Sequence, residues 1–273
     1  MQRRPDLTDR DLRELGLRDD AGTIPRVPWD EFSAHLHENW EAGQHASVFA
    51  PTEGGKTYLV RHGLLPVWKR YPVLWLKFKP RDATLDGMTR NHVRSYPEAD
   101  RRLPYRLRGL DSPKWETDPE WFVVELPTYE WKPSAKESEG VRRAREVAGR
   151  CLDRAYREGG WVIVIDEVRA FSDVEPPALQ LRALLENNWQ RGRSQPLTVV
   201  AATQQPANAP SSMYDQPRWV FLGRTLDMGR HERIGEIGGD TEVIEATLPS
   251  LQRQEFIAVD RHEGDMWVTR VEI

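Results

Sequence analysis

The sequence predicts an α/β fold with a central, mostly parallel β-sheet flanked by helices and a β-hairpin near the C-terminal end. Two observations support this prediction. Strand-like and helix-like segments alternate along most of the chain, as expected for a parallel sheet with crossover connections. The central strand-like segments are also continuously apolar, as in WVIVI at 161–165, and strands buried on both faces have this pattern.

The individual elements follow from hydrophobic spacing and turn residues. Residues 1–30 are polar and rich in proline, so we expect an N-terminal arm with a short amphipathic helix near 7–17. Residues 31–273 are expected to form a single domain. The predicted helices cover 29–40, 57–68, 139–158 and 176–193, and the predicted strands cover 46–50, 71–78, 121–126, 161–165, 197–203 and 218–224. Residues 255–273 are expected to form an antiparallel hairpin that turns at 262–264.

Residues 79–115 differ from the rest of the domain and are predicted to be a basic insertion. Nine Lys or Arg residues face five Asp or Glu residues between Lys79 and Lys114, an excess of four positive charges. The insertion could be a loop that contacts phosphates, or simply a solvated surface segment. The arginines that would contact phosphates are Arg81, Arg90, Arg94, Arg101, Arg102, Arg106 and Arg108.

Composition argues against several classes of protein. The single cysteine, Cys151, excludes a disulfide framework, fits a reducing cytoplasm and is interpreted as structural. No apolar run approaches the roughly twenty residues of a membrane span, and the charged first residues do not resemble a signal peptide. The formal net charge of −4 is not that of a protein that coats DNA, so any nucleic-acid contact would need a local basic patch.

A candidate phosphate-binding loop lies between the first predicted strand and the next helix. SVFAPTEGGKTYLV at 47–60 contains the pattern G-x-x-x-x-G-K-[ST], with Ala50 at the first glycine position. Small residues let backbone N–H groups face the phosphates, Lys56 can reach the β- and γ-phosphates, and Thr57 can supply a hydroxyl to Mg²⁺. The segment could also be an ordinary turn. The residues predicted to contact the nucleotide are Pro51, Thr52, Glu53, Gly54, Gly55, Lys56, Thr57 and Tyr58.

Two more polar groups follow buried strands. VIVIDE places Asp166 and Glu167 at a strand end, where Asp166 could hold Mg²⁺ and Glu167 could activate a water molecule. ATQQP at 202–206 places Thr203 and Gln204 at another strand end, where they could contact the γ-phosphate or the water. Each motif alone could be a capped helix or a turn. Because the carboxyl ends of parallel strands share one edge, the three motifs together predict a nucleoside triphosphatase.

The sequence resembles the FtsK–HerA family of DNA-pumping ATPases over most of residues 43–240. The matching segments are GQHASVFAPTEGGKT (43–57), VLWLKFKPRDATLDG (73–87), GGWVIVIDEV (159–168), RGRSQPLTVVAATQQP (191–206) and PRWVFLGRTLDMGRHERIGEIGG (217–239). A phosphate loop is common to many families. Its combination with the Asp-Glu strand end, the Gly-Arg segment and the A-T-Q-x-P strand end is much more specific. Ala50, Lys77 with Lys79, and Gln205 depart from the usual family pattern without removing a hydrolytic group.

The resemblance implies a RecA-like (ASCE) P-loop NTPase fold and a homo-oligomeric ring, usually hexameric, with ATP and Mg²⁺ held between subunits. It implies that Lys56 and Thr57 bind phosphate and metal, that Asp166 and Glu167 form the Walker B pair, and that Gln204 is the γ-phosphate sensor. An arginine from a neighbouring subunit is also expected. The candidates are Arg218, then Arg224, then Arg193.

The function that the resemblance implies is ATP-driven, sequence-independent translocation of double-stranded DNA, for viral genome packaging or transfer of a mobile element. The ring would dock on a portal, capsid or conjugation component, in the cytoplasm or a virion, and no membrane partner is expected. One alternative is a P-loop ATPase that remodels or assembles a protein partner without moving DNA. Another is a binding module in which nucleotide only locks an oligomer, and the presence of Glu167 argues against it.

Overall fold

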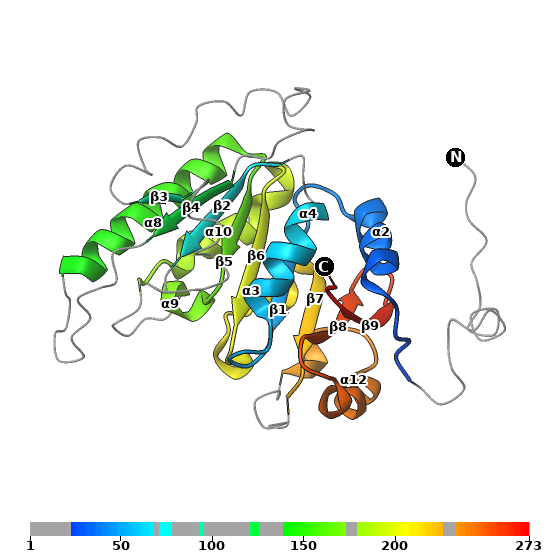
Figure 1. The fold of residues 1–273 in the computed structure, drawn as a ribbon. Coiled ribbons are helices and arrows are strands. Elements are labelled where there is room, and N and C mark those ends of the chain that lie inside the picture. The colour runs from blue at the N-terminus through cyan, green and yellow to red at the C-terminus, as the bar shows by residue number, and fades with distance from the viewer. Residues whose placement is uncertain are drawn as a thin grey trace.

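The computed structural model describes residues 23–67, 71–77, 93–95, 121–125, 139–172, 179–225 and 233–272. Strands in this part of the chain form one nine-stranded sheet in the order β3-β4-β2-β5-β6-β1-β7-β8-β9 (Figure 1). The strands are β1 (His45–Phe49), β2 (Val73–Lys77), β3 (Val93–Ser95), β4 (Trp121–Glu125), β5 (Val162–Ile165), β6 (Thr198–Thr203), β7 (Pro217–Gly223), β8 (Glu255–Asp260) and β9 (Met266–Arg270).

The sheet has a parallel part and an antiparallel part. The strands from β3 to β7 in the sheet order are all paired in parallel. Strand β8 is antiparallel to both β7 and β9, which confirms the predicted hairpin. The predicted fold class, a mostly parallel sheet with a C-terminal hairpin, is therefore confirmed.

Helices cover both faces of this sheet (Figure 1). The helix α8 lies toward the β3 end of the sheet, and α2 lies toward the β9 end, where it contacts β9 (Figure 1). The α-helices are α2 (Trp29–Asn39), α3 (Lys56–Tyr58), α4 (Leu65–Val67), α8 (Glu139–Glu158), α9 (Val168–Ser172), α10 (Arg182–Arg191), α11 (Ser212–Asp215) and α12 (Thr241–Thr247). A π-helical segment, η1 (Leu59–Leu64), joins α3 to α4, so the helix predicted after the phosphate loop contains a π-turn.

The continuously apolar strands are explained by two buried clusters, one on each face. In β5, Ile163 and Ile165 belong to the cluster that includes residues of α8, α9 and α10. Their neighbours Val162 and Val164 belong to the other cluster, with residues of α2 and the helical segment after the phosphate loop. Because successive residues of a strand point to opposite faces, a strand covered on both faces must be apolar at every position.

Two predicted regions lie partly outside the described residues. Of the predicted N-terminal arm (1–30), the structure describes 23–30. Residues 29 and 30 begin α2, and Pro25 and Val27 form backbone hydrogen bonds with Val268 of β9. Of the basic insertion, it describes only the backbone of β3, a short edge strand that hydrophobic spacing did not predict. The rest of the insertion and residues 1–22 lie outside the described part of the chain. The side chains of the candidate phosphate-contacting arginines are therefore not described.

Candidate functional site

The topology brings the three predicted motifs to one edge of the sheet. Strand β1, which leads into the phosphate loop, lies between β6 and β7, and β5 lies beside β6. All four strands are parallel, so their carboxyl ends share an edge. Open α/β sheets bind their ligands outside these carboxyl ends, because the connecting loops separate there.

The phosphate loop forms a tight turn around Lys56. Gly55 has a φ of 88°, a left-handed conformation that glycine adopts without steric cost. Glu53 also has a positive φ, of 61°, and its side chain is exposed, so its charge faces solvent. The Lys56 ammonium group is 2.8 Å from the carbonyl oxygens of both Ala50 and Pro51, and the residue is only 7% exposed. The loop therefore holds a buried cation against its own backbone.

The structure explains why alanine is tolerated at the first position of this loop. The side chain of Ala50 is buried between two glycines, Gly54 of the loop and Gly223 at the end of β7. A β-carbon on Gly223 would lie 2.5 Å from the β-carbon of Ala50, and one on Gly54 would lie 3.0 Å from it. The methyl group that the loop gains at Ala50 is accommodated because Gly223 lacks one.

The Asp-Glu pair lies directly beyond β5. Asp166 is 4% exposed, and Glu167 is half-buried. The hydroxyl of Thr203, at the end of neighbouring β6, donates a hydrogen bond of 3.2 Å to Oε1 of Glu167 and accepts one of 3.2 Å from the backbone N–H of Gln205. The orientation of the candidate water-activating carboxylate is thereby linked to the conformation of the loop after β6.

That loop is also bonded to the phosphate loop. The hydroxyl of Thr52 donates a hydrogen bond of 2.6 Å to Oε1 of Gln204, so the predicted sensor contacts the phosphate loop directly. Arg169 of α9 donates to the side chain of Gln205. The motif analysis did not identify Arg169, although its place three residues after Asp166 is a sequence signal that it lies near the site.

The predicted arginines occupy different places. Arg218 lies at the amino end of β7, at the edge of the sheet opposite the phosphate loop. Its guanidinium forms a buried ion pair with Asp260, with nitrogen–oxygen distances of 2.6 to 3.1 Å, and donates to the carbonyl of Asn39 at 2.7 Å. The hydrogen bond to Asp260 raises the pKa of Arg218 above its ordinary value.

Arg218 is therefore not brought to the site, and its guanidinium is already bound within its own subunit. Arg224, in contrast, is exposed and directly follows β7 at the same edge as the phosphate loop. The side chain of Arg193 lies outside the described part of the structure. Tyr58, the last residue predicted to contact nucleotide, is half-buried, and its ring centroid lies 4.7 Å from that of His62.

The residues predicted to hold Mg²⁺ fit such an ion in their chemistry. Thr57 supplies a hydroxyl at the start of the helix after the loop, and Asp166 supplies a carboxylate at the end of β5, both at the ligand-binding edge. No group of three or more His, Cys, Asp or Glu side chains among the described residues could hold a metal by itself. Mg²⁺ in such sites uses one or two protein oxygens together with substrate phosphates and water, so this sparse donor set is suitable.

Among the helices that the structure describes, none has the length and apolar character needed to cross a membrane.

Comparisons with known proteins show the fold. No protein-family model matches the chain, and no curated protein matches its sequence. The DNA-packaging ATPase B204 from Sulfolobus Turreted Icosahedral Virus superposes with a TM-score of 0.55 at 14% identity, covering 85% of this chain and all of that chain. VirB4 of Thermoanaerobacter pseudethanolicus gives a TM-score of 0.58 at 13% identity, covering 84% of this chain and 89% of that chain.

The genome packaging NTPase B204 from Sulfolobus turreted icosahedral virus 2, in complex with sulfate, gives a TM-score of 0.55 at 12% identity, covering 86% of this chain and 99% of that chain. Two of these three structures are of viral genome-packaging enzymes, one described as an ATPase and the other as an NTPase. At such low identities the similarity is one of fold, and it confirms the P-loop NTPase fold that the family resemblance implies.

Proposed function

We propose that this protein is an ATP-hydrolysing motor that forms a ring and translocates double-stranded DNA, in genome packaging or in transfer of a mobile element. The observation that carries the proposal is the set of hydrogen bonds joining the three motifs at one sheet edge. Thr52 bonds to Gln204, and Thr203 bonds to Glu167. A structural role alone would not need one strand end, that of β6, to bond both to the phosphate loop and to a carboxylate that can activate water.

The residues have separate tasks in the proposed reaction. Backbone N–H groups of the loop and the ammonium group of Lys56 bind the phosphates, so Lys56 exchanges its two carbonyl partners for phosphate oxygens. Glu167 orients the attacking water and accepts its proton, and Gln204 positions that water against the γ-phosphate. Mg²⁺, held by Thr57 and Asp166, would neutralise charge on the phosphate oxygens.

An arginine from the neighbouring subunit is expected to complete the site, and we assign this role to Arg224. Arg224 is exposed at the edge where hydrolysis takes place, whereas Arg218 is held by Asp260. A cation supplied in this way makes hydrolysis dependent on assembly, because a separate subunit lacks it. The assignment of a ring, hexameric in the related family, rests on this need for a second subunit.

Two findings support a role in DNA movement. Proteins with the same fold include a viral DNA-packaging ATPase and a viral genome packaging NTPase, and the latter was solved in complex with ATP-gammaS and with AMPPCP. The insertion at 79–115 carries the local excess of positive charge that a sequence-independent phosphate contact requires. If the protein forms a ring, the arginines of this insertion, one set from each subunit, would surround the duplex with positive charge.

The test is the ATPase rate measured against protein concentration, with and without linear duplex DNA. We expect a steep rise with concentration, because the site needs a neighbour, and a further stimulation by DNA that weakens as salt increases. Activity that rises with concentration but ignores long duplex DNA would reject the translocase and favour an ATPase that remodels a protein partner. Absence of hydrolysis in assembled protein would reject both.

A further inference from the structure

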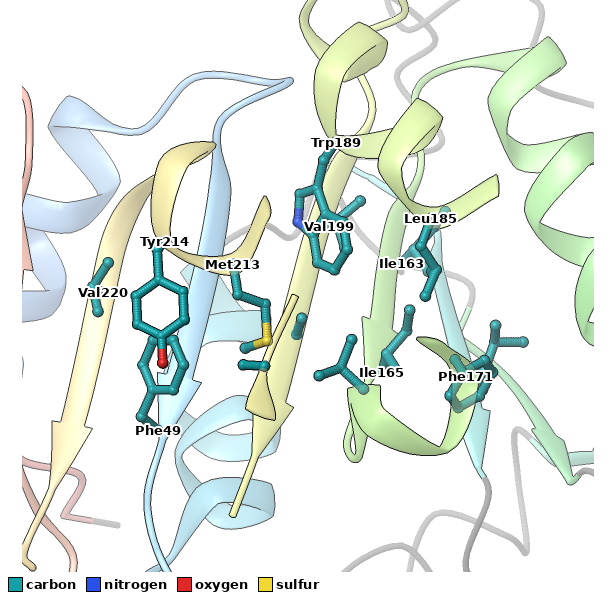
Figure 2. Packing of buried hydrophobic residues seen from close by; sticks show 14 of the residues in the cluster. Phe49, Ile163, Ile165, Phe171, Leu185, Trp189, Val199, Met213, Tyr214 and Val220 are labelled. Atoms are coloured by element: carbon teal, nitrogen blue, oxygen red, sulfur yellow. The ribbon is translucent and has the colours of Figure 1, made fainter. Parts of the chain in front are cut away.

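Tyr214 contacts the segments on either side of the proposed hydrolytic site without being part of the site's surface. It lies on α11, eight residues after Pro206, and is only 1% exposed. Its ring stacks on Phe49 with the centroids 4.9 Å apart and an interplanar angle of 27° (Figure 2). Phe49 is the last residue of β1, so the next residue of the chain begins the phosphate loop.

The hydroxyl of Tyr214 reaches the loop that carries the sensor. It donates a hydrogen bond of 2.5 Å to the carbonyl oxygen of Pro206, which also accepts the N–H of Ala209 at 2.9 Å. Pro206 directly follows Gln205, and Gln205 bonds to the Thr203 hydroxyl that holds Glu167. Burial raises the pKa of Tyr214 above its ordinary value, so the hydroxyl stays protonated and remains a donor throughout the working pH range.

Arg233 fixes the same tyrosine from another part of the chain. Its guanidinium lies 3.9 Å from the centroid of the Tyr214 ring, and it donates to the carbonyl of Ala209 at 2.7 Å. Glu236 binds the same guanidinium through two further hydrogen bonds. One cation thus contacts both the ring of Tyr214 and the end of the loop that follows β6.

We infer that Tyr214 is a positioning residue for ATP hydrolysis, which fixes the loop carrying Gln204 relative to the strand that carries the phosphate loop. This inference rests on the proposed function. Stacking on Phe49 positions the Tyr214 ring against β1, and the hydroxyl of Tyr214 positions Pro206 through its hydrogen bond. Small displacements of catalytic groups are costly, because an error of about 1 Å in alignment can lower a rate about 100-fold.

The first test measures the loop directly and does not need turnover. Tyr214→Phe keeps the aromatic stack and removes only the hydroxyl, and Tyr156→Phe makes the same change in a half-buried tyrosine of α8. In hydrogen–deuterium exchange, we expect amides between Gln204 and Ala209 to exchange about tenfold faster in the first variant and at the wild-type rate in the second. Unchanged exchange in this segment would overturn the inference.

The second test asks whether Tyr214 affects the rate of hydrolysis through the position of Gln204. We expect Tyr214→Phe to lower kcat about tenfold and to leave the affinity for a fluorescent ATP analogue within about twofold. In a Gln204→Ala background, Tyr214→Phe should have a clearly smaller further effect, since only the link through Thr203 to Glu167 is then left to disturb. Equal effects in both backgrounds would show a general loss of structure and overturn the positioning role.

The two tests separate failure of this inference from failure of the proposed function. If wild-type protein does not hydrolyse ATP, the proposed function fails, and the exchange result still decides whether Tyr214 fixes the loop. If Tyr214→Phe does not fold, Arg233→Gln removes the cation that packs on the Tyr214 ring and so loosens the tyrosine without altering it. Faster exchange at the Gln205 amide, which Arg233 does not contact directly, is then expected, and wild-type exchange there would overturn the inference.

Discussion

The two edges of the parallel sheet use similar polar residues in different ways. At the amino edge, the buried pair Arg218–Asp260 is closed within the subunit, and His45 accepts a hydrogen bond from the N–H of Val199 while its other ring nitrogen donates to the carbonyl of Trp189. At the carboxyl edge, Lys56 bonds to carbonyl groups of its own loop, and Gln204 joins the loop after β6 to the phosphate loop. The bonds at the amino edge are therefore buried contacts that stabilise the fold, whereas those at the carboxyl edge involve the loops that we propose bind nucleotide.

The largest effect that this comparison predicts is at Glu167. Glu167→Gln keeps the size of the side chain and removes the base, so we expect ATP turnover to fall about 10⁴-fold with nucleotide binding unchanged. Turnover by malachite-green phosphate release and binding of a fluorescent analogue measure the two quantities. Glu245→Gln, on the exposed face of α12, is the matched control and should behave as wild type. Persistent turnover in the Glu167 variant would show that the site is assigned wrongly.

Arg224 tests whether the carboxyl edge is completed by a neighbour. We expect Arg224→Ala to lower turnover about 10³-fold, the lower end of the range for such arginines, while Arg191→Ala on α10 should have no effect. Mixing Arg224→Ala subunits with Glu167→Gln subunits should restore part of the activity, because some interfaces then combine an intact Glu167 with an intact Arg224. No recovery on mixing would mean that Arg224 does not act between subunits.

A substitution at the amino edge should lower the free energy of unfolding. Arg218→Ala leaves the carboxylate of Asp260 buried without its partner, and removing one member of a buried ion pair costs about 3–5 kcal/mol of unfolding free energy. Urea unfolding measures this cost. Glu186→Ala, which breaks the exposed pair with Arg182, should cost less than about 1 kcal/mol. If Arg218→Ala kept its stability and lost only the concentration-dependent turnover, Arg218 would be the arginine that acts between subunits.

The smallest effect concerns the fit between Ala50 and Gly223. Gly223→Ala places two β-carbons at an impossible separation, and overpacking of this kind costs about 1–3 kcal/mol. We expect a lower melting temperature and weaker nucleotide binding, since the first residue of the loop must move. Adding Ala50→Gly should restore both properties, and a double variant no better than Gly223→Ala would show that the two residues are not coupled.

Much of the fold was predictable because its signals are local. The helix predicted at 139–158 has those bounds in the structure, since its apolar residues repeat at helical spacing over five turns. The apolar runs likewise located β1, β2, β4, β5, β6 and β7. The three-residue strand β3 was not predicted because it has no apolar run, and the π-turn in η1 has no distinct sequence pattern.

The sequence alone determined the identity and spacing of the motifs at the ends of β1, β5 and β6, and with them the prediction that this edge binds phosphate. These features are local, because a strand that ends in a polar loop is visible in a few consecutive residues. The tertiary structure decided that Arg218 pairs with Asp260 and that Tyr214 stacks on Phe49. Such contacts join residues 42 and 165 positions apart (260 − 218 and 214 − 49), and no periodicity records them. They depend on strand order and register, which only the folded chain defines.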